Sequence, residues 1–215
     1  MNQASDKYRN FNQLLSSERE GIDFLRKIKK RNSGWTILAP HGGGIEPGTS
    51  EIAIAIAGSN HSLYTFEGIK IKGNKSLHIT STKFDDPKLL KLLNSSMETI
   101  VIHGCKGKEQ IAYIGGRQNK IRDKIITQLL VNGINSTINS DPDLQGTDIN
   151  NICNRNLSGE GIQIELSEGL RSAMFSSLTR TGRKITTELF TIFVNAVKNV
   201  IDEFQHSGLL TVRKT

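Results

Sequence analysis

Short β-rich runs alternate with helical patterns along the chain, and this alternation constrains the fold more than any other feature. The strand candidates are TILA (36–39), LHITS (77–81), ETIVIHG (98–104), EQIAYIGG (109–116) and GIQIEL (161–166). Helical spacing of apolar residues covers 86–97, 118–133 and 185–205, and Thr49 or Ser50 is expected to cap a further helix over EIAIAIAG. Strands interleaved with helices predict an α/β fold with an open, mostly parallel or mixed sheet flanked by helices.

The chain shows no internal division. No repeat, low-complexity tract or linker interrupts its 215 residues, so we expect one domain over 1–215 with a core of its own. Cys105 and Cys153 match no zinc-ribbon or thioredoxin spacing and are expected to be reduced thiols. No run approaches the ~20 apolar residues of a membrane span, and the first residues lack a signal-peptide core. We expect synthesis in the cytoplasm and no membrane partner.

The chain carries a net charge of +7, which favours a polyanionic partner. The basic residues are spread along the sequence, and the one cluster, RKIKKR (26–31), is typical of a solvated face at a helix end. Aromatic residues make up 6% of the chain, too few for the interleaved aromatics of single-strand nucleic-acid binding. A nucleic-acid binder is therefore a disfavoured interpretation.

Polar residues able to bind metal or move protons stand at the ends of three expected strands. His41 follows TILA, His103 lies near the end of ETIVIHG, and Glu165 lies near the end of GIQIEL. Ligands of open α/β sheets bind outside the carboxyl ends of the strands. The pattern predicts a functional site where these three strands end.

The stretch HGGGIE (41–46) admits three interpretations. A phosphate cradle is disfavoured, because the nearest P-loop match, 68–76, carries an inserted Asn74 and no G-x-G-x-x-G follows a strand. An esterase oxyanion loop needs a G-x-S-x-G nucleophile elbow, which the sequence lacks. A metal site remains, since three glycines let the loop fold back and bring His41 and Glu46 together.

His103 is the expected third metal ligand, which gives two histidines and one carboxylate with a fourth position left for water. A hydrogen-bonded core histidine is the alternative role for His103. His78 is held as a neighbouring residue or substitute ligand, and Cys105 is expected to be a small buried residue. His61 is expected at the surface, and His206 at the end of the last helix as a cap.

At these motifs the sequence resembles a known family. APHGGGIEPGTSEIAIAIAG, TSTKFDDP, VIHGC followed by IGG, and GIQIELSEGLR resemble the zinc-dependent poly-γ-glutamate hydrolases of Bacillus phages and related bacterial genes, in order from residue 8 to 183. The resemblance implies a zinc-carboxypeptidase-like fold, one zinc per chain on His41, Glu46 and His103, and endo-hydrolysis of γ-glutamyl amide bonds in poly-γ-glutamate. It also implies action on host capsule outside the cell after host lysis.

The resemblance further implies roles for an acid and several arginines. Glu165 resembles the general base of zinc carboxypeptidases, with Glu168 as the alternative base, and Asn154-Arg155 resembles their carboxylate-gripping pair, although here it follows His103. Arg117, Arg155 and Arg171 are expected to bind the α-carboxylates of the polymer. We expect a monomer that binds no nucleic acid. The rival interpretation is a zinc amidohydrolase or carboxypeptidase that acts on a small acyl-amino acid in a closed pocket.

Overall fold

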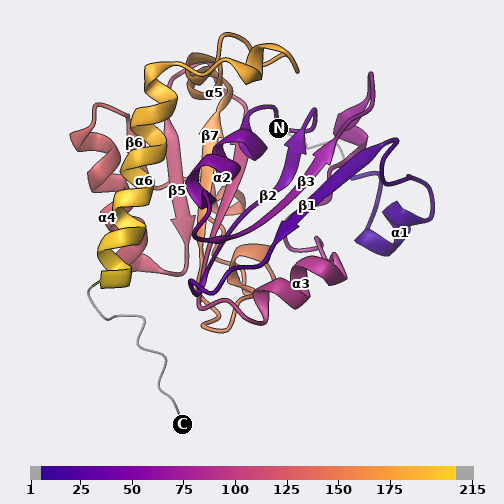
Figure 1. Ribbon diagram of the computed structural model, residues 1–215, viewed down its shortest axis with the longest axis horizontal. Coiled ribbons are helices and arrows are strands. Elements are labelled where there is room, and N and C mark those ends of the chain that lie inside the picture. Colours follow the sequence, from indigo (N-terminus) through magenta and orange to yellow (C-terminus); the bar gives the residue numbers. More distant parts are fainter. Residues whose placement is uncertain (1–5, 207–215) are drawn as a thin grey trace.

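A seven-stranded mixed sheet organises the chain in the computed structural model, which describes residues 6–206 (Figure 1). The strand order is β1-β3-β2-β4-β7-β5-β6. The strands are β1 (Phe24–Lys29), β2 (Trp35–Gly43), β3 (Ser62–Gly68), β4 (Glu98–Cys105), β5 (Ala112–Gly116), β6 (Ser136–Thr137) and β7 (Ile162–Ser167). The α-helices are α1 (Phe11–Leu15), α2 (Thr49–Ala57), α3 (Pro87–Leu93), α4 (Asn119–Val131), α5 (Glu168–Met174) and α6 (Glu188–His206). The expected α/β class with a mixed, helix-flanked sheet is confirmed.

The four central strands β3, β2, β4 and β7 run parallel; β1 is antiparallel to β3, and β5 is antiparallel to β7 but parallel to β6. Figure 1 shows that β2, β3 and β7 run in the opposite direction to β1 and β5. We call the end of the sheet where the four parallel strands finish its carboxyl end, and the opposite end its amino end. In β4 and β7, His103 lies opposite Glu165, so two of the expected site residues are cross-strand neighbours.

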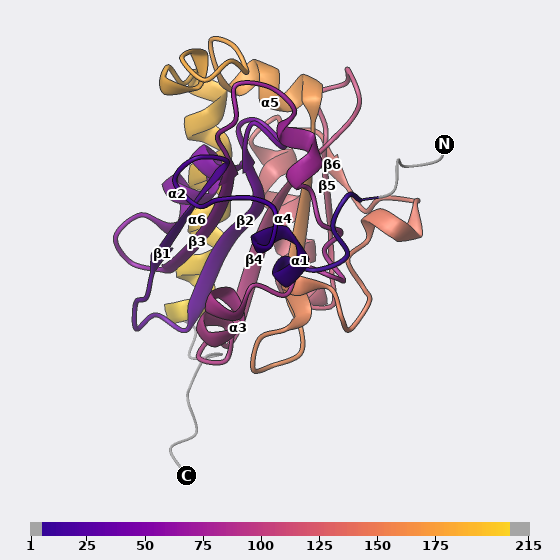
Figure 2. The ribbon, with the colours of Figure 1, turned by 90° about the vertical axis from the view of Figure 1, so that its right-hand side faces the viewer.

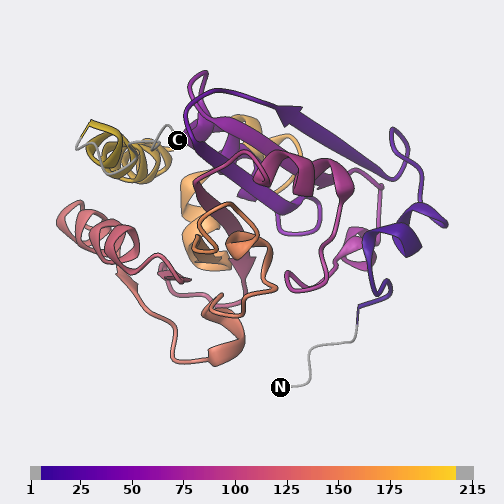
Figure 3. The same cartoon turned by 90° about the horizontal axis from the view of Figure 1, so that it is seen from below.

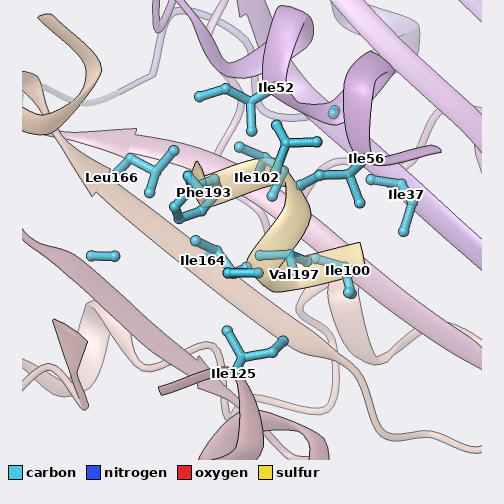
Figure 4. Close-up of a cluster of buried hydrophobic side chains, with 14 of the residues drawn as sticks. Ile37, Ile52, Ile56, Ile100, Ile102, Ile125, Ile164, Leu166, Phe193 and Val197 are labelled. Atoms are coloured by element: carbon cyan, nitrogen blue, oxygen red, sulfur yellow. The ribbon is translucent and has the colours of Figure 1, made fainter. Parts of the chain in front are cut away.

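Alternation along the strands divides the core into two layers. Ile100 and Ile102 of β4 belong to the larger cluster, under α2, α4, α5 and α6, whereas Val101 belongs to the cluster under α1 and α3. Figure 3 shows α4 and α6 on one side of the sheet, Figure 2 shows α1 and α3 on the other, and Figure 4 shows the larger cluster. Because side chains alternate with a period of two, His103 and Glu165 face the same side as Val101.

Two expected elements differ from the structure. The expected strand at 77–81 is absent from the sheet: Leu77 ends a short 3₁₀ helix, η1 (Asn74–Leu77), and the following residues run beside the sheet. The Asp6 carboxylate accepts hydrogen bonds from the backbone N–H and the hydroxyl of Thr80, at 2.6 and 2.7 Å. The Thr80 N–H, which a neighbouring strand would accept if this segment joined the sheet, is therefore bonded to a side chain instead. The basic cluster at 26–31 lies mainly on the edge strand β1 rather than at a helix end. Exposed lysines suit an edge strand because they discourage pairing with another chain.

The helix expected after the glycine loop is present, but its cap is different. Gly48, with φ of 102°, occupies the N-cap of α2 in place of Thr49 or Ser50. The left-handed backbone of Gly48 lets the chain turn directly from Glu46 into the helix. The Ser50 hydroxyl accepts a hydrogen bond from the Gly43 N–H at 3.2 Å instead, which ties the glycine loop to the first turn of α2.

The boundaries of the other elements shift by a few residues at most, apart from the strand at 36–39, which extends to Trp35–Gly43 as β2. β1, β3, α1 and α5 were not expected from the sequence. Cys105 and Cys153 are free thiols, as expected. Within residues 6–206, no helix combines the length and the apolar character needed to cross a membrane.

Candidate metal centre

A bulge at the end of β2 aims His41 into the candidate site. Ala39 pairs with Thr65 and Gly42 with Glu67, so Pro40 and His41 together stand opposite one residue of β3. Bulges of this kind re-aim side chains at the ends of strands. The His41 ring is almost completely buried.

The three glycines fold the chain back so that Glu46 returns to His41. The Glu46 N–H donates to the His41 carbonyl at 2.8 Å, which closes the loop. Gly43 has φ of 66°, and a Cβ there would lie 2.4 Å from the Gly68 carbonyl oxygen. At Gly44, a Cβ would lie 2.5 Å from the Asn74 amide nitrogen. A side chain at Gly43 would push the loop away from β3, and one at Gly44 would displace the Asn74 side chain of η1, which explains the glycines.

His41, Glu46 and His103 bring two imidazole nitrogens and the two oxygens of one carboxylate together. The His41 Nδ1 lies 3.1 Å from Glu46 Oε1 and 3.1 Å from His103 Nδ1, and His103 Nδ1 lies 3.5 Å from Glu46 Oε2. In a tetrahedral zinc site with bonds of about 2.0–2.2 Å, ligand atoms are separated by about 3.3–3.6 Å. The three residues therefore have the spacing and the donor chemistry of a zinc site.

The outer nitrogens of both histidines are already engaged. The His41 Nε2–H donates to the Ile79 carbonyl at 2.8 Å, which leaves Nδ1 of the neutral ring without a proton. The His103 Nε2 lies 3.0 Å from the Ser81 hydroxyl. Burial, and then the neighbouring His78, lower the pKa of His41 to about 4, so its ring is neutral at neutral pH. Neutral histidines oriented by hydrogen bonds on the far nitrogen are the usual metal ligands.

His78 forms a second possible triad with His41 and Glu46, whose ligand atoms all lie within 4.8 Å of one another. The His78 ring lies 4.0 Å from the His41 ring, but its Nε2 is 3.9 Å from Glu46 Oε1, farther than His103. The His78 Nδ1–H donates to Asp6 at 2.7 Å, so Nε2 faces the site. We favour His103 because its distances match a tetrahedral ion more closely. No local motif predicts the role of Asp6, which is 72 residues away from His78 along the chain.

Glu165 lies beside this cluster on β7 and is buried. Burial, together with the adjacent Glu46, raises the pKa of Glu165 to about 7 against the opposing effect of His103. For Glu46, burial is outweighed by His41 and His103, which lower the pKa of its carboxyl. Two carboxyls at one site thus differ in proton affinity, an arrangement that suits one for holding a cation and the other for moving a proton.

Several other sequence expectations can be placed. Glu168 is exposed at the start of α5, and Cys105 is half-buried, with a pKa that burial raises to about 12. His206 lies in the last turn of α6, as expected, with its ring 2.7 Å from the Asp202 carbonyl. The prediction that His61 lies at the surface is wrong, because its side chain is buried.

The three arginines expected to bind substrate do not gather at the cluster. Arg171 comes closest, but its guanidinium donates to the carbonyls of Leu166, Pro47 and Cys105, so it ties the strand ends to the glycine loop. Arg117 follows β5, and because β5 is antiparallel to β7, its backbone N–H reaches Gly161 at the amino end of the sheet.

Arg155 is likewise far from the cluster. It caps the short 3₁₀ helix η3 (Ile152–Asn154) and is exposed. The neighbouring Asn154 accepts the Gly161 N–H at 3.0 Å, which anchors this turn at the start of β7. Asn154 also donates to the Gly146 and Asp148 carbonyls, so this pair serves the local turn.

A basic hollow that sequence reasoning missed adjoins the glycine loop. Its volume is about 210 Å³, and Gly44 and Pro47 of the loop form part of its lining. The cationic residues in the lining are Lys70, Arg180 and Arg183. Arg183 pairs with Glu51 at 2.8 Å, and Lys70 pairs with Glu18 at 2.6 Å, whereas Arg180 is exposed and donates to the Ile69 carbonyl. These residues come from segments far apart in sequence, so no local motif announces them.

Comparison with known proteins connects this geometry to a family. The family model described as poly-gamma-glutamate hydrolase matches residues 8–196. The SPbeta prophage-derived protein YoqZ of Bacillus subtilis is 39% identical over 202 residues, which cover 93% of this chain and 73% of YoqZ. The B. subtilis protein YndL is 37% identical over 184 residues, covering 85% of this chain and 72% of YndL.

Solved structures agree with these matches. The structure of a bacteriophage poly-gamma-glutamate hydrolase superposes with a TM-score of 0.90 at 32% identity, covering 95% of this chain and all of that one. A zinc-free apo structure of YndL superposes with a TM-score of 0.87 at 35% identity, covering 92% and 98% of the two chains. The resemblance seen in the sequence is confirmed: the chain belongs to the poly-γ-glutamate hydrolase family of enzymes.

Proposed function

We propose that the protein is a zinc-dependent hydrolase that cleaves γ-glutamyl amide bonds within poly-γ-glutamate, with one zinc per chain held by His41, Glu46 and His103. The observation that carries the proposal is the close approach of His41 Nδ1, His103 Nδ1 and the Glu46 carboxylate at the carboxyl end of the sheet, with distances of 3.1 to 3.5 Å between the nitrogens and from each nitrogen to a carboxylate oxygen. The family to which the chain belongs supports the substrate.

Zinc, when bound, would lower the pKa of a coordinated water and polarise the scissile carbonyl. Glu165 is the general base in this proposal: its carboxylate accepts a proton from the attacking water and returns it to the leaving nitrogen. A pKa of about 7 suits both transfers, because the group is partly ionised at neutral pH and can also donate. Glu168 is the less suitable base, because it lies exposed on α5.

The basic hollow beside the glycine loop supplies the better contacts to substrate. Each internal unit of the polymer carries a free α-carboxylate, and an exposed guanidinium binds carboxylates in a bidentate manner. We assign this role first to Arg180, whose exposed side chain lines the hollow. Arg171 positions the loop, and Arg117 and Arg155 would contact only a polymer that extends to the other end of the sheet.

The basic hollow favours a long anionic substrate over a small acyl-amino acid, because its exposed Arg180 can bind a carboxylate of a chain that continues beyond the cluster. Endo cleavage, a monomeric enzyme and action on capsule after host lysis complete the proposal. A size-exclusion assay of polymer length distinguishes endo cleavage, which shortens chains quickly, from terminal release of single units. Added DNA should compete weakly.

The first experiment measures zinc in purified variants by atomic spectroscopy together with polymer cleavage. We expect about one zinc per wild-type chain and loss of zinc and activity in His41→Ala, Glu46→Ala and His103→Ala. His206→Ala is the matched control, because it removes an exposed histidine at the end of α6. Full zinc retention in His103→Ala with loss in His78→Ala would transfer the third ligand position to His78.

A further inference from the structure

A second cavity lies at the opposite end of the sheet from the metal cluster. Its volume is about 360 Å³, and it is lined at the start of β2 and β4 by Trp35 and Glu98. Arg117 and Gln118, at the end of β5 and the start of α4, form another wall. None of these residues belongs to the proposed zinc ligands, the general base or the basic hollow, and the volume admits an amino-acid-sized molecule.

Two almost completely buried side chains of this cavity each have one polar atom without a hydrogen-bond partner within residues 6–206. Glu98 is 7% exposed; its Oε2 has no partner, and its Oε1 accepts one long hydrogen bond, 3.4 Å, from the Gln118 amide. The Trp35 indole N–H is also without an acceptor. Leaving a buried polar group unsatisfied is costly, so such groups call for an explanation in terms of function or ligand.

The other wall of the cavity is suited to an anion. The helix α4 is 13 residues long, and its N-cap, Gln118, makes no capping hydrogen bond with its side chain, which is turned towards Glu98. The first N–H groups of a helix have no acceptor within the helix and attract negative charge. Arg117 and Lys120 add two cations there.

The charges facing the cavity are balanced. Glu98 and Glu160 supply two carboxylates, and Arg117 and Lys120 supply two cations. A polyanion would be repelled by the carboxylates, and a simple cation by the basic residues. A molecule with an ammonium and a carboxylate on the same carbon satisfies both walls, because the ammonium donates towards Glu98 while the carboxylate accepts from the start of α4 and from Arg117.

We propose that this cavity binds the zwitterionic end of an α-amino acid, with Glu98 receiving the ammonium and Arg117 and the start of α4 receiving the carboxylate. Two sources have this chemistry. One is a free amino acid such as glutamate. The other, which rests on the proposed function, is the amino-terminal unit of a γ-glutamyl chain, which alone in the polymer carries both an ammonium and a carboxylate on its α-carbon.

Trp35 provides a local probe, because it is the one tryptophan of the chain and lines the cavity. The indole N–H signal in NMR spectra and the intrinsic fluorescence are followed while full-length protein is titrated with glutamate to about 10 mM, the range of weak amino-acid affinity. A short γ-glutamyl oligomer is titrated in the same way into the Glu165→Gln protein, and mass spectrometry checks that it stays intact. N-acetylglutamate and the N-acetylated oligomer lack the ammonium and serve as matched ligands.

We expect a saturable Trp35 response to the free-amine ligands and at least about tenfold weaker binding of the acetylated ones. A response to glutamate would show that a free amino acid is enough to occupy the cavity. A response to the oligomer alone would identify the amino-terminal unit of the chain as the ligand. Glu98→Gln and Arg117→Ala should each weaken binding about tenfold, whereas Arg9→Ala, an equal charge loss on an exposed arginine elsewhere, should not.

No saturable response to either free-amine ligand would overturn the proposal, as would unchanged binding in both Glu98→Gln and Arg117→Ala, or equal binding of acetylated ligands. Because the readout is binding at Trp35 and not turnover, these outcomes are independent of whether the protein cleaves poly-γ-glutamate.

Discussion

Two acidic residues at opposite ends of the same sheet have opposite pKa shifts. Glu46, at the carboxyl end, lies beside His41 and His103, which lower the pKa of its carboxyl, and it accepts the Gly104 N–H at 2.8 Å. Glu98, at the amino end, has a single weak amide contact, and burial raises its pKa to about 7. Burial disfavours the ionised form of both carboxyls, so the neighbouring groups decide whether each pKa is raised or lowered.

The difference teaches how each end of the sheet is used. At the carboxyl end, charged and polar partners come from four separate segments and are mutually satisfied, as expected of a site that holds a cation. At the amino end, buried polar atoms of Trp35 and Glu98 have no hydrogen-bond partner in the described part of the chain, as expected of a site that a ligand completes. Four substitutions can break or sharpen this contrast.

The largest effect is expected at Glu165. Glu165→Gln removes the proposed base while keeping size and hydrogen-bonding capacity, so turnover should fall by ~10²- to 10⁴-fold with zinc content unchanged. Polymer shortening and metal analysis measure the two quantities. Glu168→Gln provides the comparison and should retain most activity. The reverse result, with Glu165→Gln active and Glu168→Gln inactive, would move the base to α5.

A smaller effect is expected from the carboxylate behind His78. Asp6→Asn weakens the hydrogen bond that holds the His78 ring against the proposed ligand His41, so zinc affinity or turnover should fall by ~10- to 100-fold. Competition with a chelating dye measures the affinity. Asp23→Asn makes the same change at a carboxylate that accepts the Arg19 N–H away from the cluster. Equal values in the two variants would exclude His78 from the metal site.

At the amino end, Glu98→Gln should stabilise the protein while weakening the ligand binding proposed above. A carboxyl whose pKa rises from 4.5 to about 7 on folding favours the folded state most below pH 4.5. This contribution is lost as the pH rises to 7. We expect the variant to be more stable by about 1–3 kcal/mol at pH 8 and similar to wild type at pH 4.

Urea unfolding at both pH values measures the change at Glu98. Wild-type stability should therefore fall more steeply between pH 4.5 and 7 than that of Glu98→Gln. Identical slopes would show that Glu98 is solvated and paired in the folded protein, and would remove one support of the cavity proposal.

The smallest effect is expected at Ser50, whose hydroxyl ties the glycine loop to α2 through the Gly43 N–H. Ser50→Ala should lower the free energy of unfolding by ~0.5–1.5 kcal/mol, the usual value of one hydrogen bond. Ser16→Ala removes an exposed hydroxyl that donates to the Gln13 carbonyl and serves as the control in denaturant unfolding. An equal, negligible loss in both variants would mean that the glycine contacts with β3 alone fix the loop.

Much of the carboxyl end could be predicted from the sequence. Apolar strands ending in His41, His103 and Glu165 placed three chemistry-bearing residues at one end of a sheet, because parallel strands finish together. The glycines between His41 and Glu46 indicated a loop that folds back, since only glycine tolerates the backbone and the close approach found at Gly43. These signals are local, and local geometry follows from local sequence.

The tertiary structure alone decided the rest. The antiparallel pairing of β5 carried Arg117 to the amino end, and strand direction depends on long-range pairing that a single strand sequence does not specify. Asp6 reaches His78, and Arg180 and Lys70 meet beside the glycine loop, only because the chain folds over distances of many residues. The sequence by itself determined the metal-binding chemistry and the end of the sheet that carries it. Packing decided which charges surround that site and which buried groups, such as Glu98, remain for a ligand.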